Sequence, residues 1–418
     1  MTSRERLLAS IEHRVPDKVP LDLGATPSSG ISAIAYAKLR DHLHINEGST
    51  DVYDVVQQLA QPEEKILDRF GVDVVDIGRT FNTNDSDWTE TILASGHSAR
   101  YPAWFKPEQE ADGTWLARHH DGSSIARMPS GATFFDQTYY PYENGYPEDW
   151  KGLDDEMGRV LWSALVHSPW DNAGKPDFWK TLREHALQLR ASSDRAIMLS
   201  AGCNLFEWGT FLRRMDNFLV DLLIEPETVA SLLDALLERH LAMLEKICGA
   251  VGDVVDIIRL GDDLGTDQGL FMNPEIYRSL FKPRHKILCN YIKSHSSMKT
   301  FLHSCGSIHS VIPDLVEIGF DVINPVQTNA RGMEPSYLKK EFGKDICFWG
   351  GGIDTRAMLN NGRPDEVKEQ VLERLEIFSK DGGYVFNTVH NILPDVPPEN
   401  IVAMFDAVRE YNGEENPK

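Results

Sequence analysis

The segment KTFLHSCGSIHSVIPDLVEIGFDVINPV, residues 299–326, contains one complete copy of the pattern that decides the fold. Its apolar runs at 299–306 and 321–326 are typical of buried strands, and the amphipathic stretch between them is typical of a helix. A strand, a helix and a second strand in this order form a parallel βα unit. The segment therefore predicts an α/β protein built on a parallel sheet.

Runs of this kind recur along the chain. They are rich in Val, Ile, Phe and Thr, end near Gly, Asp or Asn, and cover residues 19–25, 71–78, 196–202, 254–263, 299–306, 321–326, 346–353 and 383–389. Eight strands in βα alternation predict a closed (β/α)8 barrel, the TIM barrel. Such barrels often carry insertions, so we expect residues 1–418 to form one elaborated domain.

The interval between the second and third runs is far too long for a single helix. Residues 85–160 are rich in aromatic residues, Gly and Pro, and we expect them to form an insertion within the barrel. Within it, GTWLARHHDGSSIARM predicts a β-hairpin that turns at Asp121 and Gly122. A lid over the barrel and a dimer surface are both open roles for this insertion.

Composition excludes several classes of partner. The chain has 42 basic and 64 acidic residues, a formal net charge of −22, and no basic run that would follow phosphates, so nucleic acid is not an expected partner. There is no apolar stretch of about 18 residues and no signal-like start, so we expect a soluble cytoplasmic protein without a membrane partner. The five cysteines are scattered, which predicts free thiols.

The working groups of a TIM barrel lie at the carboxyl ends of its strands. Among the polar residues at these ends, we expect catalytic roles for Asp76, Asp262 and Asp263, and substrate-binding roles for Cys203, Asn204, Asn324, Gln327 and Asp354. Simpler roles stay open. The paired aspartates can cap the helix near residue 274, Asp76 can make a strand-end hydrogen bond, and Asp354 can cap the next helix.

A metal site is predicted from His303 and Cys305. They lie two positions apart in a strand, so their side chains share one face. An imidazole and a thiolate on one face can bind the same zinc ion, and His390, at the end of the eighth run, can supply a third ligand. Three protein ligands and one open position are the pattern of a catalytic zinc site. In the alternative interpretation, Cys305 is a small buried apolar residue and His303 a hydrogen-bonded core histidine.

Seven ordered motifs resemble the uroporphyrinogen decarboxylase superfamily. They are RVPDKVPLDLG, RFGVDVVDIG, GDDLGTDQGLFMNPEIYRSLFKP, FLHSCGSI, EIGFDVINPVQ, FWGGGID and GYVFNTVHNILPDVPPENI. The resemblance covers most of the chain, is weakest in the insertion, and implies a (β/α)8 barrel with its cleft at the carboxyl ends of the strands.

This chain departs from each of two branches of the superfamily at one motif. True uroporphyrinogen decarboxylases carry an RQAGR-like stretch after the first strand, whose arginines bind substrate carboxylates, and this chain has LDLGATPSSGIS there. The other branch contains corrinoid-dependent methyltransferases, in which zinc is bound by His-x-Cys and a later Cys. HSCG at 303–306 matches the first two ligands, whereas the third falls at about His390, the residue that the decarboxylases hold there.

The resemblance therefore implies a zinc-dependent methyltransferase or demethylase. It would move a methyl group between a small substrate or thiol and a corrinoid, either methylcobalamin itself or a corrinoid protein partner. The alternative is a metal-assisted decarboxylase, lyase or hydrolase of a small carboxylated substrate without a corrinoid. A non-catalytic binding protein is the third alternative, and the family resemblance also leaves a homodimer open.

Overall fold

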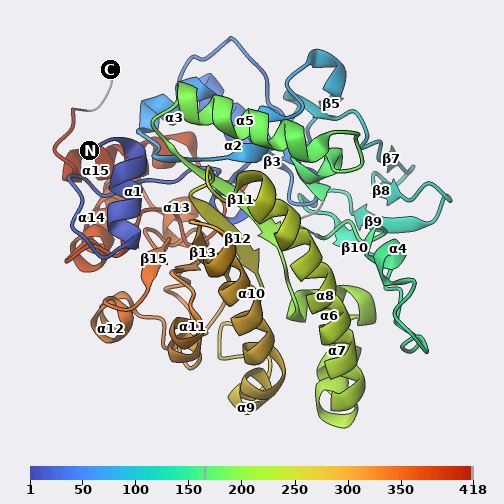
Figure 1. Ribbon diagram of the computed structural model, residues 1–418. Helices are drawn as coiled ribbons and strands as arrows, with labels where there is room; N and C mark the ends of the chain where they lie inside the picture. Colours follow the sequence, from blue (N-terminus) through green and yellow to red (C-terminus); the bar gives the residue numbers. More distant parts are fainter. Residues whose placement is uncertain (164–165, 416–418) are drawn as a thin grey trace.

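The centre of the protein is a curled parallel sheet. The computed structural model describes residues 1–163 and 166–415, and Figure 1 shows the chain from its N-terminus in blue to its C-terminus in red. Seven strands follow one another in the sheet in their chain order: β4 (Val74–Asp76), β11 (Ala196–Gly202), β12 (Ile257–Gly261), β13 (Lys299–His303), β14 (Val322–Asn324), β15 (Cys347–Trp349) and β16 (Tyr384–Val385). All neighbouring pairs are parallel, as the βα alternation predicts.

The eighth position of the barrel is filled by the segment around Leu21, which bridges the two edges of the sheet. On one side, the Asp22 N–H donates to the Phe386 carbonyl at 3.0 Å, and the Phe386 N–H donates to the Pro20 carbonyl at 2.8 Å. On the other side, the Asp73 N–H donates to the Leu21 carbonyl at 2.8 Å. The predicted TIM-barrel class is confirmed. The first strand is much shorter than the predicted run at 19–25, because the chain turns away from the sheet after Asp22: Gly24 has φ +83°, and the Ala25 N–H donates to the Asp22 carboxylate.

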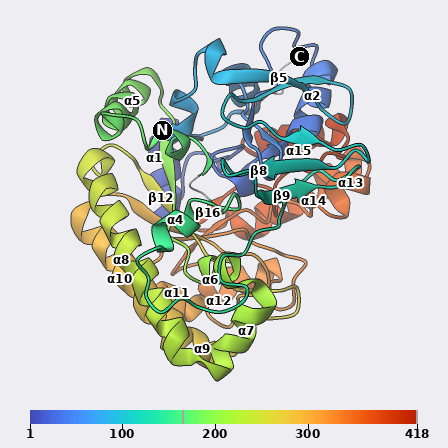
Figure 2. The ribbon, with the colours of Figure 1, turned by 90° about the vertical axis from the view of Figure 1, so that its right-hand side faces the viewer.

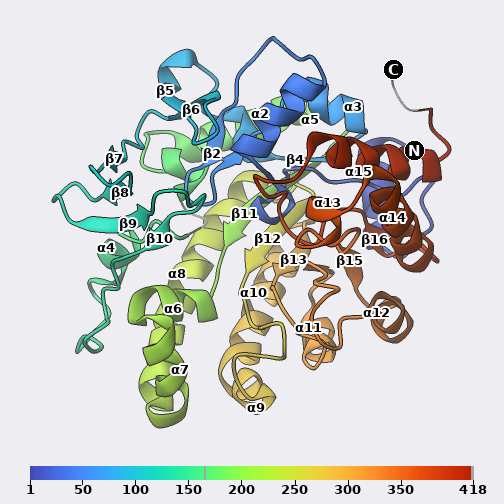
Figure 3. The same cartoon turned by 180° about the vertical axis from the view of Figure 1, so that it is seen from behind.

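Helices cover the outer face of the sheet, as Figures 1 and 3 show from opposite sides. The main ones are α5 (Phe178–Ser192), α8 (Pro226–Val251), α10 (Lys282–His295), α11 (Ile312–Ile318), α12 (Pro335–Phe342), α14 (Pro364–Phe378) and α15 (Pro398–Tyr411). All but α5 have proline in their first turn, where the missing N–H costs no hydrogen bond. The predicted helices at the sequences of α11 and α14 are present.

The shorter elements connect these units. The helices are α1 (Ser3–Ile11), α2 (Ala33–His42), α3 (Glu64–Phe70), α4 (Leu153–Met157), α6 (Phe206–Arg213), α7 (Met215–Ile224), α9 (Pro274–Ile276) and α13 (Met358–Asn361). The short strands β1 (Ile31–Ser32), β2 (Val52–Asp54) and β3 (Leu59–Ala60) form a separate three-stranded sheet. In the described part of the chain, no helix has both the length and the apolar character needed to cross a bilayer.

The interval between β4 and β11 forms two antiparallel sheets, which project to one side in Figure 1 and face the viewer in Figure 2. Their strands are β5 (Trp88–Ile92), β6 (Ser98–Pro102), β7 (Glu108–Gln109), β8 (Trp115–Arg118), β9 (Ser124–Met128) and β10 (Asp136–Gln137). The predicted hairpin is present, since β8 pairs with β9 and Gly122 has φ +85° at the turn. This interval packs its own small apolar cluster against Val55 and Val56.

Candidate metal and substrate site

The barrel interior changes from apolar to polar along each strand. Val74, Met198, Ile257, Phe301 and Val322 form part of a fully buried inner cluster. Two residues further along each strand, the same inward face carries a polar side chain, because successive side chains alternate between the two faces of a sheet. These residues are Asp76, Ser200, Arg259, His303 and Asn324. This polar layer closes the apolar core at the carboxyl ends of the strands, where Asp76, His303 and Asn324 are the last residues of β4, β13 and β14.

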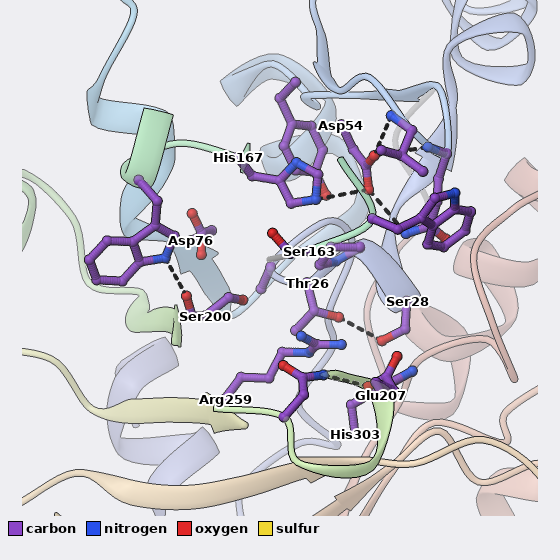
Figure 4. A pocket seen from close by; sticks show the side chains of 18 of the residues that line it. Thr26, Ser28, Asp54, Asp76, Ser163, His167, Ser200, Glu207, Arg259 and His303 are labelled. Atoms are coloured by element: carbon purple, nitrogen blue, oxygen red, sulfur yellow. Dashed lines mark hydrogen bonds and ion pairs between the residues drawn. The ribbon is translucent and has the colours of Figure 1, made fainter. Parts of the chain in front are cut away.

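A cavity of about 350 Å³ lies over this polar layer. Its lining combines barrel residues with loops from the N-terminal third and from the segment before β11, and Figure 4 shows ten of these side chains with labels. Aromatic side chains of Tyr53, Phe134, Trp162, Trp170 and Phe211 form part of its wall. The volume suits one small molecule.

His303 is held in one orientation by Asn324. The Asn324 amide donates to the Trp349 carbonyl at 2.9 Å, so its Oδ1 must be the acceptor toward His303 Nδ1 at 2.9 Å and Ser28 Oγ at 2.7 Å. The proton of the neutral imidazole therefore lies on Nδ1, and the lone pair lies on Nε2. A hydrogen bond to the second ring nitrogen is the usual way in which a metal-binding histidine is oriented.

His303, Cys305 and His390 come together beside the cavity. Cys305 Sγ lies 3.5 Å from His303 Nε2, and one ligand atom from each of the three residues lies within 4.8 Å of the others. Tetrahedral zinc with bonds of 2.0–2.3 Å needs ligand atoms about 3.3–3.8 Å apart. The three residues thus fit a zinc ion after a small inward movement.

The electrostatics of these residues agree with metal binding. Burial, and then the nearby Arg259 charge, lower the pKa of His303, and burial lowers the pKa of His390. Both imidazoles are therefore neutral near pH 7, with a lone pair available. Burial and the acidic neighbours Asp263 and Glu207 raise the pKa of Cys305, so the thiol needs a cation beside it to become a thiolate.

The two neighbouring aspartates have different positions. Asp263 accepts from the Cys305 N–H at 2.9 Å, lies 3.5 Å from His303 Nε2 and lines the cavity. Asp262 is fully buried outside the cavity lining and accepts from the N–H groups of Phe206 and Glu207 at 3.0 and 2.9 Å. It therefore caps the start of α6, not the helix near residue 274, and leaves Asp263 as the cavity acid.

Two further acids line the cavity. Asp76 accepts from the Gly78 N–H at 2.6 Å, and burial raises the pKa of its carboxyl to about 7. Glu207, in the first turn of α6, was not predicted from the sequence, and burial followed by the charge of Asp263 raises its pKa to about 8. Both acids hold protons near neutral pH and are suited to general acid catalysis.

The remaining predicted residues divide between the cavity and its surroundings. Asn204 lines the cavity, where its amide contacts Glu207. Cys203 lies outside it, with Sγ toward the Ala201 carbonyl at 3.8 Å. Gln327 accepts from the Gly306 N–H at 2.9 Å, and Asp354 accepts from the Arg356 N–H at 2.8 Å, so both organise loops.

Four buried polar atoms in the lining have no hydrogen-bond partner in the described residues. They are Tyr53 Oη, His167 Nδ1, Ser200 Oγ and Arg259 Nε. None of these residues was predicted from the sequence. The available signal was the arginine inside the apolar strand DIIRLG, two positions after the inward Ile257.

Removal of the Asn324 hydrogen bond should weaken metal binding without removing a ligand. We expect Asn324→Leu to lower zinc affinity about 10- to 100-fold, because the imidazole loses the acceptor that fixes its tautomer. Competition with a chromogenic chelator measures this change. Gln327→Leu is the matched amide control, since Gln327 bonds to the Gly306 backbone, and an equal loss in both variants would contradict the orienting role of Asn324.

The raised pKa of Asp76 predicts a dependence of stability on pH. The carboxyl titrates at about 7 in the folded protein, whereas an aspartate in an unfolded chain titrates at 3.8, so ionisation opposes folding as the pH rises through this window. We expect Asp76→Asn to match the wild type near pH 4 and to be more stable by about 1–3 kcal/mol at pH 8, after allowance for screening by cavity water. Urea unfolding at several pH values measures the difference, and a constant difference would contradict the shift.

Comparisons with known proteins agree with this architecture. Residues 206–411 match the family model described as uroporphyrinogen decarboxylase (URO-D). Curated relatives named uroporphyrinogen decarboxylase include one from Methylococcus capsulatus and one from Chloroherpeton thalassium. The first is 36% identical over 62 residues, which are 15% of this chain and 17% of the relative. The second is 21% identical over 186 residues, which are 43% of this chain and 52% of the relative. The chain thus spans about half or less of the length of these relatives.

A solved structure described as a methyltransferase from Methanosarcina mazei shares the fold over almost the whole chain. It is 18% identical, has a TM-score of 0.59, and the match covers 98% of this chain and 99% of the other. The predicted superfamily resemblance is therefore confirmed in sequence for residues 206–411 and in fold for the full barrel.

Proposed function

We propose, from the premise that residues 206–411 form a uroporphyrinogen decarboxylase (URO-D) family domain, that this protein is a zinc-dependent enzyme that moves a methyl group between a small substrate and a corrinoid carrier. The convergence of His303, Cys305 and His390 beside the cavity carries the proposal. The fold shared with the Methanosarcina mazei methyltransferase supports the choice of methyl transfer.

The cavity is a poor host for uroporphyrinogen. The segment Gly24–Ser28, which replaces the arginine-bearing stretch of the decarboxylases, lines the cavity with small side chains and no cation. A macrocycle with eight carboxylates needs several cations, and in the described lining Arg259 is the one Lys or Arg side chain. A small substrate fits both the volume and the charge.

Zinc, when bound, would keep the Cys305 thiol as a thiolate and act as a Lewis acid toward a substrate oxygen or sulfur. The chain itself positions the ligand set, because Asn324 holds His303 and the Cys305 N–H is anchored on Asp263. Glu207 holds a proton near neutral pH and can give it to the substrate heteroatom that loses its methyl group.

One observation favours the alternative of a metal-assisted decarboxylase, lyase or hydrolase. With His390 in place of a second thiolate, zinc with one thiolate and two neutral imidazoles would be a net cation and a stronger Lewis acid. Such a site is suited to binding a carboxylate or activating water. This alternative keeps the same cavity and metal ligands and needs no corrinoid.

One assay distinguishes methyl transfer from the metal-assisted alternative. The zinc content of the purified protein is measured first, and the zinc protein is then mixed with methylcobalamin and a panel of small thiol and hydroxyl acceptors. Loss of the methylcobalamin spectrum with the zinc protein, and not with protein stripped by a chelator, supports methyl transfer. Zinc without any reaction of methylcobalamin, together with conversion of a small carboxylate, supports the alternative. Absence of stoichiometric zinc contradicts both.

A further inference from the structure

We infer that Arg259 and Ser200 form a subsite that binds the carboxylate of a small substrate with a flat apolar body. The inference deepens the proposed function and rests on it in one respect, since it takes the cavity to be the place where the substrate reacts. The metal ligands are not part of this subsite.

Arg259 is a buried cation without a partner. It lies in the middle of β12, is 8% exposed and lines the cavity. Its Nε has no hydrogen bond, and in the described part of the chain no carboxylate oxygen lies within 4.0 Å of its guanidinium. Burying an unpaired charge costs several kcal/mol. A buried arginine without an ion pair therefore indicates that a ligand supplies the anion.

Ser200 lies directly beside Arg259. The two residues are paired in the ladder between β11 and β12, and neighbouring strands are about 4.8 Å apart with paired side chains on the same face. Ser200 Oγ is also buried without a partner. Figure 4 shows the Arg259 side chain extending from its strand toward the middle of the cavity. A guanidinium and a hydroxyl that share a face offer three donors to one carboxylate.

The charge of the cavity lining favours a substrate with a single carboxylate. Arg259 is accompanied in the described lining by Asp54 and Asp263, and by Asp76 and Glu207, whose pKa values are raised to about 7 and 8 so that they carry little of the negative charge near neutral pH. A dianion such as phosphate, or a substrate with several carboxylates, would meet more repulsion than one guanidinium offsets. One planar carboxylate matches the fork of one arginine.

The aromatic walls of the cavity favour a substrate whose remaining part is flat and apolar. Trp162, Trp170, Phe134 and Phe211 present aromatic surface to the cavity, and the about 350 Å³ volume admits one small molecule. Flat apolar groups pack well against such walls. Benzoate is therefore a suitable probe of the subsite, and benzamide is its neutral counterpart of the same shape.

The test measures benzoate and benzamide binding by titration calorimetry with protein stripped of metal, so that zinc cannot hold the carboxylate. We expect the wild type to prefer benzoate about 10- to 100-fold, the difference associated with a charged hydrogen-bonded pair. Arg259→Met should reduce the preference to less than about twofold, and Ser200→Ala should reduce it about threefold. Arg356→Met removes the same charge from an exposed arginine outside the cavity and should keep the preference.

Thermal unfolding separates this role from a structural one. Arg259→Met should fold with an equal or higher Tm, because it removes an unpaired buried charge. Equal binding of benzoate and benzamide by the wild type, retention of the preference in Arg259→Met, or failure of this variant to fold would each overturn the subsite. A metal-free wild type that prefers benzoate supports the subsite even if the zinc proposal fails. A zinc protein without the preference rejects only the subsite.

Discussion

Cys305→Ser is expected to give a folded protein that purifies without stoichiometric zinc and does not react with methylcobalamin. Cys305 supplies the one thiolate of the three-residue ligand set, and its Sγ lies 3.5 Å from His303 Nε2. Serine keeps the size of the side chain and loses the soft sulfur donor that zinc prefers. We expect zinc affinity to fall by at least about 100-fold, since replacing even a residue that only orients a ligand costs 10- to 100-fold. Elemental analysis after dialysis measures the change.

The control for this variant is Cys248→Ser. Cys248 is also a free thiol, but it lies on α8, outside the ligand set. It should retain the zinc content of the wild type. If Cys248→Ser loses zinc as Cys305→Ser does, the loss reflects general thiol chemistry. If Cys305→Ser keeps one equivalent of zinc, the metal lies elsewhere and the proposed function fails.

Asp262→Ala is expected to lower the free energy of unfolding by about 3–5 kcal/mol, the cost of removing one partner from a buried charged network. Asp262 is fully buried and accepts from the Phe206 and Glu207 N–H groups. It also contacts His285 Nε2 at 3.1 Å. The substitution leaves all of these donors without an acceptor in the interior. Urea unfolding measures the loss as a lower midpoint at constant slope.

The adjacent acid provides the matched control. Asp263 has a side chain that is 36% exposed, and asparagine can still accept from the Cys305 N–H. Asp263→Asn should therefore change stability by less than about 1 kcal/mol. If Asp262→Ala leaves stability unchanged and abolishes turnover, the catalytic role predicted from the sequence is correct and the capping role is secondary.

The sequence alone does not determine which carboxylate of the Asp262-Asp263 pair faces the cavity. Strand periodicity predicts that only one of two adjacent residues faces the site, and it does not say which one. The choice depends on the side chains of other elements. The start of α6 offers N–H groups to Asp262, and the Cys305 N–H turns Asp263 toward the cavity. Both contacts join residues more than 40 positions apart in the sequence.

Local pattern was sufficient for the barrel. Eight apolar runs in βα alternation were enough to predict the parallel sheet. Side-chain alternation in strands and the helical repeat depend only on residues that are close together in the sequence. Alternation also predicted that His303 and Cys305 share one face, but β13 ends at His303, and Cys305 lies in the following loop, where its N–H donates to Asp263. Only the tertiary structure decided that His390 reaches them, that Asn324 orients His303, and that Arg259 faces the cavity without a partner. These relations depend on distances between separate strands and loops, and such distances are set when the sheet closes and the loops pack above it.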